Sequence, residues 1–416
     1  MELSPEDQEI VAGRRGEAAA MAMRIVAETG RLLGADRLIP ITSAHIDGCL
    51  YHGDSGVIFA ERLAGLGARV SVPTTLNVGA LDLMHPERAR LGGSRREMAL
   101  RLMRAYETLG CKPTWTCSPY QAGHRPAAGT DVAWGESNAV VFCNSVLGAR
   151  TNRYGDFLDI ACAIIGRAPR YGLHLPENRR ATVLIDATKL SAGLRNLDTF
   201  WPVLGAWIGR NSGNRVVAVD GLQGFATEDR MKALGAAAAS FGAVGLFHII
   251  GVTPEAATPA DAFGYEQPTT TIVLTPDMMR QARDWLSTTS GERVDAVAVG
   301  SPHLSIDEMT RISELLGGRR TILPFFAHTG RHVLKRLEAD GKIAPLDAAG
   351  VSIVADTCIV VTPILPEREG VLLTNSGKFA NYAPGLTGWS VLYGSLEECV
   401  EAAVMGRLVR DEGPWA

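Results

Sequence analysis

The sequence predicts an α/β protein whose sheets are mainly parallel. Short apolar runs recur along the chain, and such runs are typical of strands buried on both faces. Stretches with helical periodicity separate these runs, and this alternation of strands and helices is typical of parallel sheets. With 416 residues, of which 46% are hydrophobic, the chain is long enough for two or three domains with sizeable cores.

The elements are expected in a definite order. Residues 5–34 carry apolar side chains at helical spacing and end at Gly34, which favours an opening helical region. Strands are expected at 37–46, 68–78, 138–146, 181–188, 215–221, 243–251, 269–275, 294–301, 320–327, 351–361 and 370–377. Helices are expected between them, at 57–68, 94–110, 228–242, 277–289 and 305–317 among others. Stretches rich in Pro, Gly or polar residues at 167–180 and 253–270 are typical of connectors, so three domains are expected, at 1–170, 171–265 and 266–416.

Charge and composition exclude several classes of partner. Lys and Arg number 41 against 45 Asp and Glu, so the net charge is -4 and no basic excess is available to bind nucleic acid. No apolar run reaches the roughly 18 residues that span a bilayer, and the polar start MELSPEDQEI does not resemble a secretory signal. Seven cysteines without a paired spacing fit a reducing compartment. We therefore expect a cytoplasmic protein with no membrane contact.

The loop 42–56 (TSAHIDGCLYHGDSG) follows an expected strand, where ligands of open α/β sheets bind. It gathers more polar side chains than packing requires: Ser43, His45, Asp47, His52, Asp54 and Ser55. A simpler interpretation is that Asp54 and Ser55 cap the next helix. The GDSG string resembles a serine-protease nucleophile sequence, but the α/β pattern excludes that class. The imidazoles and carboxylates could also bind zinc or iron, although their spacing fits no known signature.

Three further loops carry polar groups suited to a small polar ligand. Thr75 and Asn77 close the strand at 68–78, and the segment 133–156 contributes Ser137, Asn138, Asn152 and Arg153. An arginine can bind a carboxylate through two parallel hydrogen bonds. The loop 374–385 contributes Asn375, Ser376, Gly377 and Lys378, which could hold an anion, but it lacks the upstream glycine of a Walker loop.

The cysteines divide by their surroundings. Cys162 and Cys399 lie in helical contexts and are expected to pack as small apolar side chains, and the same structural role is favoured for Cys49 and Cys111. Cys117, Cys143 and Cys358 lie among polar residues at strand ends. No C-x-x-C pair is present, so spacing alone leaves a metal cluster as one alternative among several.

Several strings together resemble the large subunit of aconitase X, over nearly the whole chain. They are SAHIDGCLYHGDSG, VPTTLN, TWTCSPYQ, WGESNAVVFCNSVLGARTNRYGDF, GLHLPENR, SPHLS, DTCIVV and TNSGKFANYAPG. The resemblance implies an aconitase-like arrangement of three α/β domains and a hydro-lyase activity. Bacterial members of this family act on cis-3-hydroxy-L-proline, giving a pyrroline carboxylate, and archaeal members act on mevalonate 5-phosphate.

The resemblance also implies an iron–sulfur centre, whose ligands here would be Cys117, Cys143 and Cys358. A [2Fe–2S] cluster is expected first, with mononuclear iron or [4Fe–4S] as alternatives. The archaeal pattern has a cysteine where this chain has Ser301 and none where it has Cys143, so the bacterial type fits better. The few cationic side chains of these loops suit one carboxylate better than a carboxylate and a phosphate, which points to a small carboxylate substrate.

The dehydration that the resemblance implies gives the polar residues of these loops their expected roles. His45, Asp47, His52, Asp54 and Lys378 are expected to be catalytic. Substrate binding is expected of Ser43, Ser55, Thr75, Asn77, Ser137, Asn138, Asn152, Arg153, Asn375, Ser376 and Gly377. No swivel domain is recognised in the chain, so a separate small subunit is expected to close over the cluster and is a candidate source of the serine that takes the substrate proton. Alternatives are a mevalonate 5-phosphate dehydratase, a non-catalytic iron–sulfur scaffold subunit and, last, a metallohydrolase using the His/Asp loop.

Overall fold

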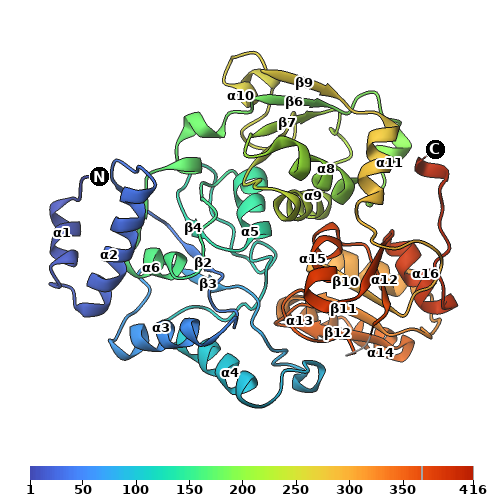
Figure 1. Ribbon diagram of the computed structural model, residues 1–416, viewed down its shortest axis with the longest axis horizontal. Helices are drawn as coiled ribbons and strands as arrows, with labels where there is room; N and C mark the ends of the chain where they lie inside the picture. The colour runs from blue at the N-terminus through green and yellow to red at the C-terminus, as the bar shows by residue number, and fades with distance from the viewer. Residues whose placement is uncertain (367–368, 416) are drawn as a thin grey trace. The chain divides into compact units, whose positions relative to one another are not determined.

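A computed structural model describes residues 1–366 and 369–415 (Figure 1). It divides into two compact units, Met1–Leu81 with Leu91–Arg180, and Asp82–Arg90 with Ala181–Ala416. The three larger sheets are parallel and alternate with helices, so the predicted α/β class is confirmed. In the part of the chain that the structure describes, no helix is both long and apolar enough to cross a membrane.

The first unit opens with the helical region predicted over 5–34, which contains two helices. They are α1 (Pro5–Val11) and α2 (Glu17–Leu32). Gly13 and Gly16 lie between them with φ of 85° and 92°, a backbone region that glycine adopts readily, and this interrupts the helix. The predicted end of the helical region at Gly34 is confirmed, because α2 ends just before this residue, whose φ is 73°.

A small buried sheet forms the centre of this unit. Its strands are β2 (Ala44–Ile46) in the middle, β3 (Thr74–Leu76) and β4 (Ala133–Trp134), all parallel. The helices of this part are α3 (Asp54–Gly65), α4 (Gly93–Thr108) and α6 (Leu158–Ile165), and α3 and α4 lie side by side (Figure 1). A separate antiparallel pair is formed by β1 (Leu38–Pro40) and β5 (Arg167–Pro169). The three parallel strands therefore end at one edge of the sheet. The loops that follow them are those predicted to carry the catalytic and binding residues.

The strand predicted over 138–146 is wrong. These residues form the helix α5 (Ser137–Phe142) and the π turn η2 (Cys143–Leu147). Glu136 starts the helix, because its carboxylate accepts a hydrogen bond from the backbone of Ala139 at 2.7 Å. Phe142 stacks on Tyr120 with ring centroids 3.5 Å apart. A short continuous apolar run does not by itself distinguish a buried strand from a buried helix, and here capping and packing decide for the helix.

The second unit begins with a four-stranded parallel sheet in the order β8-β7-β6-β9. Its strands are β6 (Val183–Asp186), β7 (Val217–Asp220), β8 (Phe247–Ile249) and β9 (Thr270–Val273). Its helices are α7 (Ala192–Arg195), α8 (Phe200–Ser212), α9 (Glu228–Phe241), α10 (Pro259–Phe263) and α11 (Pro276–Asp284). Because β9 pairs with β6, this sheet continues past residue 265.

A five-stranded parallel sheet in the order β12-β11-β10-β13-β14 completes this unit. Its strands are β10 (Ala296–Leu304), β11 (Phe325–Thr329), β12 (Val351–Ala355), β13 (Val371–Thr374) and β14 (Ser390–Tyr393). Its helices are α12 (Ile306–Leu316), α13 (Arg331–Ala339), α14 (Ile343–Ala349), α15 (Gly377–Thr387) and α16 (Leu396–Met405). The central strand β10 is buried along its whole length, as is usual for the middle strand of a parallel sheet.

Candidate functional site

The polar centre of the first unit lies at the carboxyl ends of β2 and β3. His45 on β2 pairs in register with Thr75 on β3, and Asp47 and Asn77 follow one residue beyond the two strands. The Asn77 amide donates a hydrogen bond to the Asp47 carboxylate, and the His45 ring is completely buried. Adjacent parallel strands thus bring together four of the residues selected from the sequence.

Two further residues of this centre were missed in the sequence. His124 contacts the other side of Thr75, its Nδ1 lying 2.7 Å from the Thr75 hydroxyl. The sequence shows only that His124 lies in the long loop 114–126. The position of His124 in the sequence does not reveal which strand its side chain approaches. The indole of Trp134 on β4 lies beside both imidazoles, with ring centroids 5.6 Å from His45 and 4.9 Å from His124.

Asp159 is the second missed residue. Its Oδ2 accepts hydrogen bonds from the backbone of Asp47 at 2.7 Å and of Gly48 at 3.3 Å, and its Oδ1 accepts one from Ile160 at 2.6 Å. Burial raises the pKa of Asp159 to about 8. Asp159 could have been identified as the lone carboxylate in the apolar helix sequence LDIACAII. A carboxylate is costly to bury unless it is paired or hydrogen-bonded, so its presence there indicates a specific role. Asp159 fixes the backbone of the loop that carries Asp47.

The rest of the 42–56 loop divides between the interior and the surface. Ser43 is buried, and its hydroxyl has no hydrogen-bond partner among the described residues. His52, Asp54 and Ser55 are exposed at the start of α3. The N-cap of α3 is Gly53, with no capping side chain, and Asp54 instead accepts a hydrogen bond from the Tyr51 hydroxyl at 2.9 Å. These three residues therefore do not share the burial of His45, and the alternative of side-chain capping is not observed.

Asn138 connects the two cysteine loops of the first unit. Its amide nitrogen donates to the carbonyl of Cys117 at 3.0 Å and to the Tyr120 hydroxyl at 3.1 Å. It lies on α5, which leads into Cys143 at the start of the π turn η2, and Ser137 is half-buried at the first position of this helix. The loop of Cys117 and the helix end at Cys143 are thereby held in one region.

The two remaining predicted residues of the first unit differ in exposure. Asn152 is buried, where its amide donates to the carbonyl of Tyr171 at 3.0 Å and accepts from the backbone of Leu173 at 2.8 Å. Arg153 is exposed. Asn152 therefore holds a turn of the chain in place.

No cysteine in the described ranges forms a disulfide, and all seven are buried. Cys117 and Cys143 belong to the first unit and Cys358 to the second. Burial raises the pKa of the Cys143 thiol. Within residues 1–366 and 369–415, no three His, Cys, Asp or Glu side chains are grouped as metal ligands.

In the second unit, Cys358 follows a loop with an unusual backbone. Asp356 has a φ of 62°, and Arg331 donates to its two carboxylate oxygens at 2.6 and 2.7 Å. His303 Nε2 lies 2.9 Å from the carbonyl of Thr357. Burial raises the pKa of Asp356, while the Arg331 guanidinium opposes this rise.

The loop at the start of α15 contains the other four residues predicted in this unit, and two of them have structural roles. Ser376 is the N-cap: its hydroxyl accepts from the backbone of Phe379 at 2.9 Å and donates to the carbonyl of Ser301. A Cβ on Gly377 would lie 3.0 Å from that of Ala237, so a glycine permits α15 to approach α9. Lys378 is half-buried beside it.

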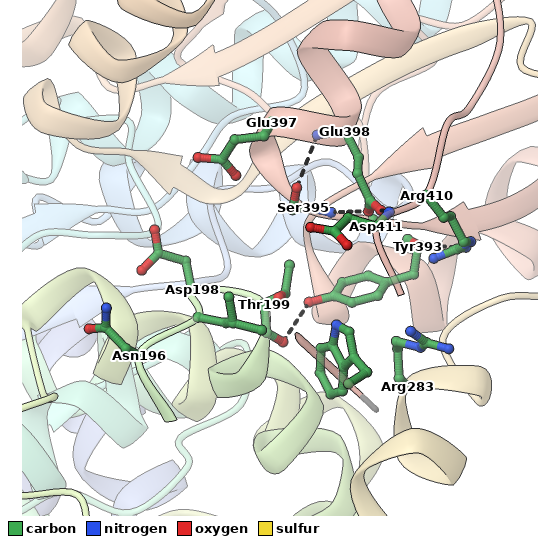
Figure 2. Close-up of a pocket in the computed structure, with 13 residues that line it drawn as sticks. Asn196, Asp198, Thr199, Arg283, Tyr393, Ser395, Glu397, Glu398, Arg410 and Asp411 are labelled. Atoms are coloured by element: carbon green, nitrogen blue, oxygen red, sulfur yellow. Dashed lines mark hydrogen bonds between the residues drawn. The ribbon is translucent and has the colours of Figure 1, made fainter. Parts of the chain in front are cut away.

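Asn375 lines a cavity of about 390 Å³ together with Thr227, Asp229 and Glu308. A second cavity of about 330 Å³, drawn in Figure 2, contains none of the predicted residues. Two of its polar side chains bond to backbone carbonyls of the lining: the Tyr393 hydroxyl donates to the carbonyl of Thr199 at 3.1 Å, and Arg410 donates to the carbonyl of Tyr393 at 2.8 Å (Figure 2). The buried polar cluster around His45 is therefore the stronger candidate.

Comparisons with protein-family models and with a solved structure agree with the observed fold. Three family models match in succession: Aconitase X first domain over residues 1–177, second domain over 181–284 and third domain over 294–405. The crystal structure of Thermococcus kodakaraensis aconitase X in its holo-form superposes with a TM-score of 0.86. It is 35% identical and covers 97% of this chain and 100% of its own.

Two curated relatives extend the comparison to named enzymes. A cis-3-hydroxy-L-proline dehydratase of Pseudomonas aeruginosa is 45% identical over 96% of this chain and 70% of its own length. A phosphomevalonate dehydratase large subunit of Methanothermobacter thermautotrophicus is 37% identical over 94% of this chain and 96% of its own. Both relatives are dehydratases, and the three family models cover the greater part of the sequence. The chain belongs to the aconitase X family of hydro-lyases.

Proposed function

We propose that this chain is the large subunit of an iron–sulfur hydro-lyase that dehydrates cis-3-hydroxy-L-proline to a pyrroline-2-carboxylate. Identity is higher to the hydroxyproline dehydratase, at 45%, than to the phosphomevalonate dehydratase, at 37%. The observation that carries the proposal is the buried centre of His45, Thr75, Asp47 and Asn77. It offers neutral and anionic groups to a small substrate, with no excess of cations for a phosphate.

We propose Cys117, Cys143 and Cys358 as the ligands of the iron–sulfur centre, with [2Fe–2S] first. All three thiols are buried. Each of these cysteines also lies at or close to an irregular stretch of backbone. Trp115 and Asp356, two residues before Cys117 and Cys358, have φ of 45° and 62°, and Cys143 begins a π turn. Strained backbone and π turns are found disproportionately at functional sites. When bound, such a centre supplies a Lewis acid that makes hydroxide a better leaving group.

The chain's own side chains would handle the proton and the substrate carboxylate. Burial lowers the pKa of His45 well below its usual value, and the nearby His124 adds to this effect. His45 is therefore a neutral imidazole at pH 7, able to accept or donate a hydrogen bond. Asp47, held by Asn77, would fix the substrate hydroxyl or ring nitrogen, and Arg153 and Lys378 would bind the carboxylate.

A separate small swivel-domain subunit completes the proposal. The Methanothermobacter relative is named a large subunit, and the match spans 96% of its length. The small subunit would close over the centre and is a candidate for the residue that removes the substrate proton. Measured alone, the large subunit should then turn over very little substrate.

The test is to co-produce the chain with the small subunit without oxygen and to measure iron, acid-labile sulfide and visible absorption. Turnover of cis-3-hydroxy-L-proline and of mevalonate 5-phosphate would be compared on the same sample. Faster turnover of the phosphorylated compound would overturn the substrate assignment. Zinc without iron and sulfide would favour the metallohydrolase instead, and calorimetry showing no substrate binding to the large subunit would favour a scaffold role.

Cysteine variants test the ligands against a matched control. Replacing Cys117, Cys143 or Cys358 by alanine should bleach the visible absorption and abolish turnover. Cys399 is equally buried but lies within α16, so Cys399→Ala should keep both. Colour and rate that survive in all three variants would refute the ligand assignment.

A further inference from the structure

One hydroxyl group in the first unit is shared by two imidazoles. Thr75 Oγ1 lies 2.8 Å from His45 Nδ1 and 2.7 Å from His124 Nδ1. His45 and Thr75 are opposite each other on neighbouring strands, whereas His124 comes from a loop. Trp134 packs beside both rings and limits their movement. The three side chains form a continuous line of hydrogen bonds.

The chemistry of a hydroxyl restricts how these bonds can be made. A hydroxyl has one hydrogen, so Thr75 can donate to only one imidazole and must accept from the other. Burial lowers the pKa of His45 well below its usual value and lowers that of His124 to about 4. Both rings are neutral at pH 7, and a neutral imidazole carries a single N–H. One ring must therefore carry its hydrogen on Nδ1 and the other on Nε2.

The outer nitrogens of the two rings have no partner of their own. Nε2 of His45 and Nε2 of His124 are buried and lack a hydrogen-bond partner among the described residues. Opposite tautomers make one of them an acceptor and the other a donor. A buried polar atom without a partner is costly, which favours a ligand that supplies both.

We propose that His45, Thr75 and His124 form one proton relay in which His124, acting through Thr75, sets the tautomer of His45. A proton that binds Nε2 of the first ring lets its Nδ1 proton pass to Thr75 Oγ1. The Thr75 hydroxyl proton then passes to Nδ1 of the second ring, whose Nε2 proton leaves. One proton enters and one leaves, so the net charge of the three side chains is unchanged and the two rings have exchanged tautomers.

This inference rests on the proposed dehydratase only for its catalytic consequence, because the tautomers can be measured without substrate. Full-length chain labelled with 15N in its histidines would be examined by long-range 1H–15N correlation, with His45→Gln and His124→Gln used to assign the two rings. We expect one ring protonated on Nδ1 and the other on Nε2. The same tautomer on both rings would overturn the proposal.

Turnover with the small subunit and cluster provides the second measurement. Thr75→Val removes the hydroxyl at nearly constant shape, and we expect kcat to fall about 100-fold with little change in KM, as for loss of general acid–base catalysis. Thr75→Ser restores a hydroxyl and should retain most of kcat. An unchanged kcat in Thr75→Val would overturn the relay. If Thr75→Val does not fold, His124→Gln with the same kcat and KM measurement replaces it. Opposite tautomers in a protein that dehydrates neither substrate would instead overturn the proposed function alone.

Discussion

Arg331 donates two hydrogen bonds to the buried carboxylate of Asp356, from Nε to Oδ1 at 2.6 Å and from Nη2 to Oδ2 at 2.7 Å. The pair joins the start of α13 to the loop after β12, two residues before Cys358. Asp356 has a positive φ of 62°, which is uncommon for a non-glycine residue. The ion pair therefore holds the loop that presents Cys358.

Removing the arginine should leave a buried charge without compensation. Arg331→Met is expected to lower the free energy of unfolding by about 3–5 kcal/mol, the usual cost of breaking a buried ion pair from one side. The double variant Arg331→Met/Asp356→Asn should recover part of this loss, because no carboxylate remains to be buried. Urea unfolding measures both effects, and a double variant as unstable as the single one would show that the unpaired charge is not the cause.

Gly205 allows α8 to lie against α9 at close range. A Cβ at this position would come within 2.2 Å of the carbonyl oxygen of Leu234, a backbone atom that cannot rotate away. Gly205→Ala should therefore force the helices apart and cost about 1–3 kcal/mol. Gly385, inside α15, has no neighbouring atom within 4 Å of its added Cβ, so Gly385→Ala should be neutral or stabilise by up to about 1 kcal/mol. Equal unfolding midpoints in the two variants would contradict this packing argument.

Regular features of the sequence predicted the class of fold and part of the site. His45 and Thr75 were found because each belongs to an apolar run followed by polar residues, and parallel strands bring such ends together. His124 was missed because a long loop determines its position, and no periodicity reports where a loop folds back. The run 138–146 was assigned to the wrong element because its apolar residues suit either a strand or a helix, and the choice was made by the Glu136 cap and by packing.

Asn152 was predicted to bind substrate, yet both ends of its amide contact backbone groups at 171 and 173. Asn152→Ala would leave those two groups unpaired and should lower the free energy of unfolding by about 1–3 kcal/mol. Asn178 bonds the same turn at an exposed position, so Asn178→Ala should change stability by less than about 0.5 kcal/mol. A raised KM with an unchanged unfolding midpoint in Asn152→Ala would support substrate contact instead.

Asp159 should make the stability of the protein depend on pH in a way that one substitution removes. Burial raises the pKa of this carboxyl to about 8 in the folded protein, from 3.8 in its absence. Between these values the folded state keeps a proton that the unfolded chain releases, so this contribution to stability is complete below pH 3.8 and is lost as pH rises towards 8.

Asp159→Asn cannot ionise and should be free of that loss. The substitution also replaces one oxygen that accepts backbone N–H groups, which adds a cost that does not vary with pH. Subtracting the free energy of unfolding of the wild type from that of Asp159→Asn at each pH separates the two effects and cancels the titration of the buried histidines. The difference should rise in favour of the variant by up to about 1.4 kcal/mol per pH unit between pH 5 and 8, and then level off. A difference that stays constant across this range would show that Asp159 is ionised in the folded protein, held so by the N–H groups of Asp47, Gly48 and Ile160.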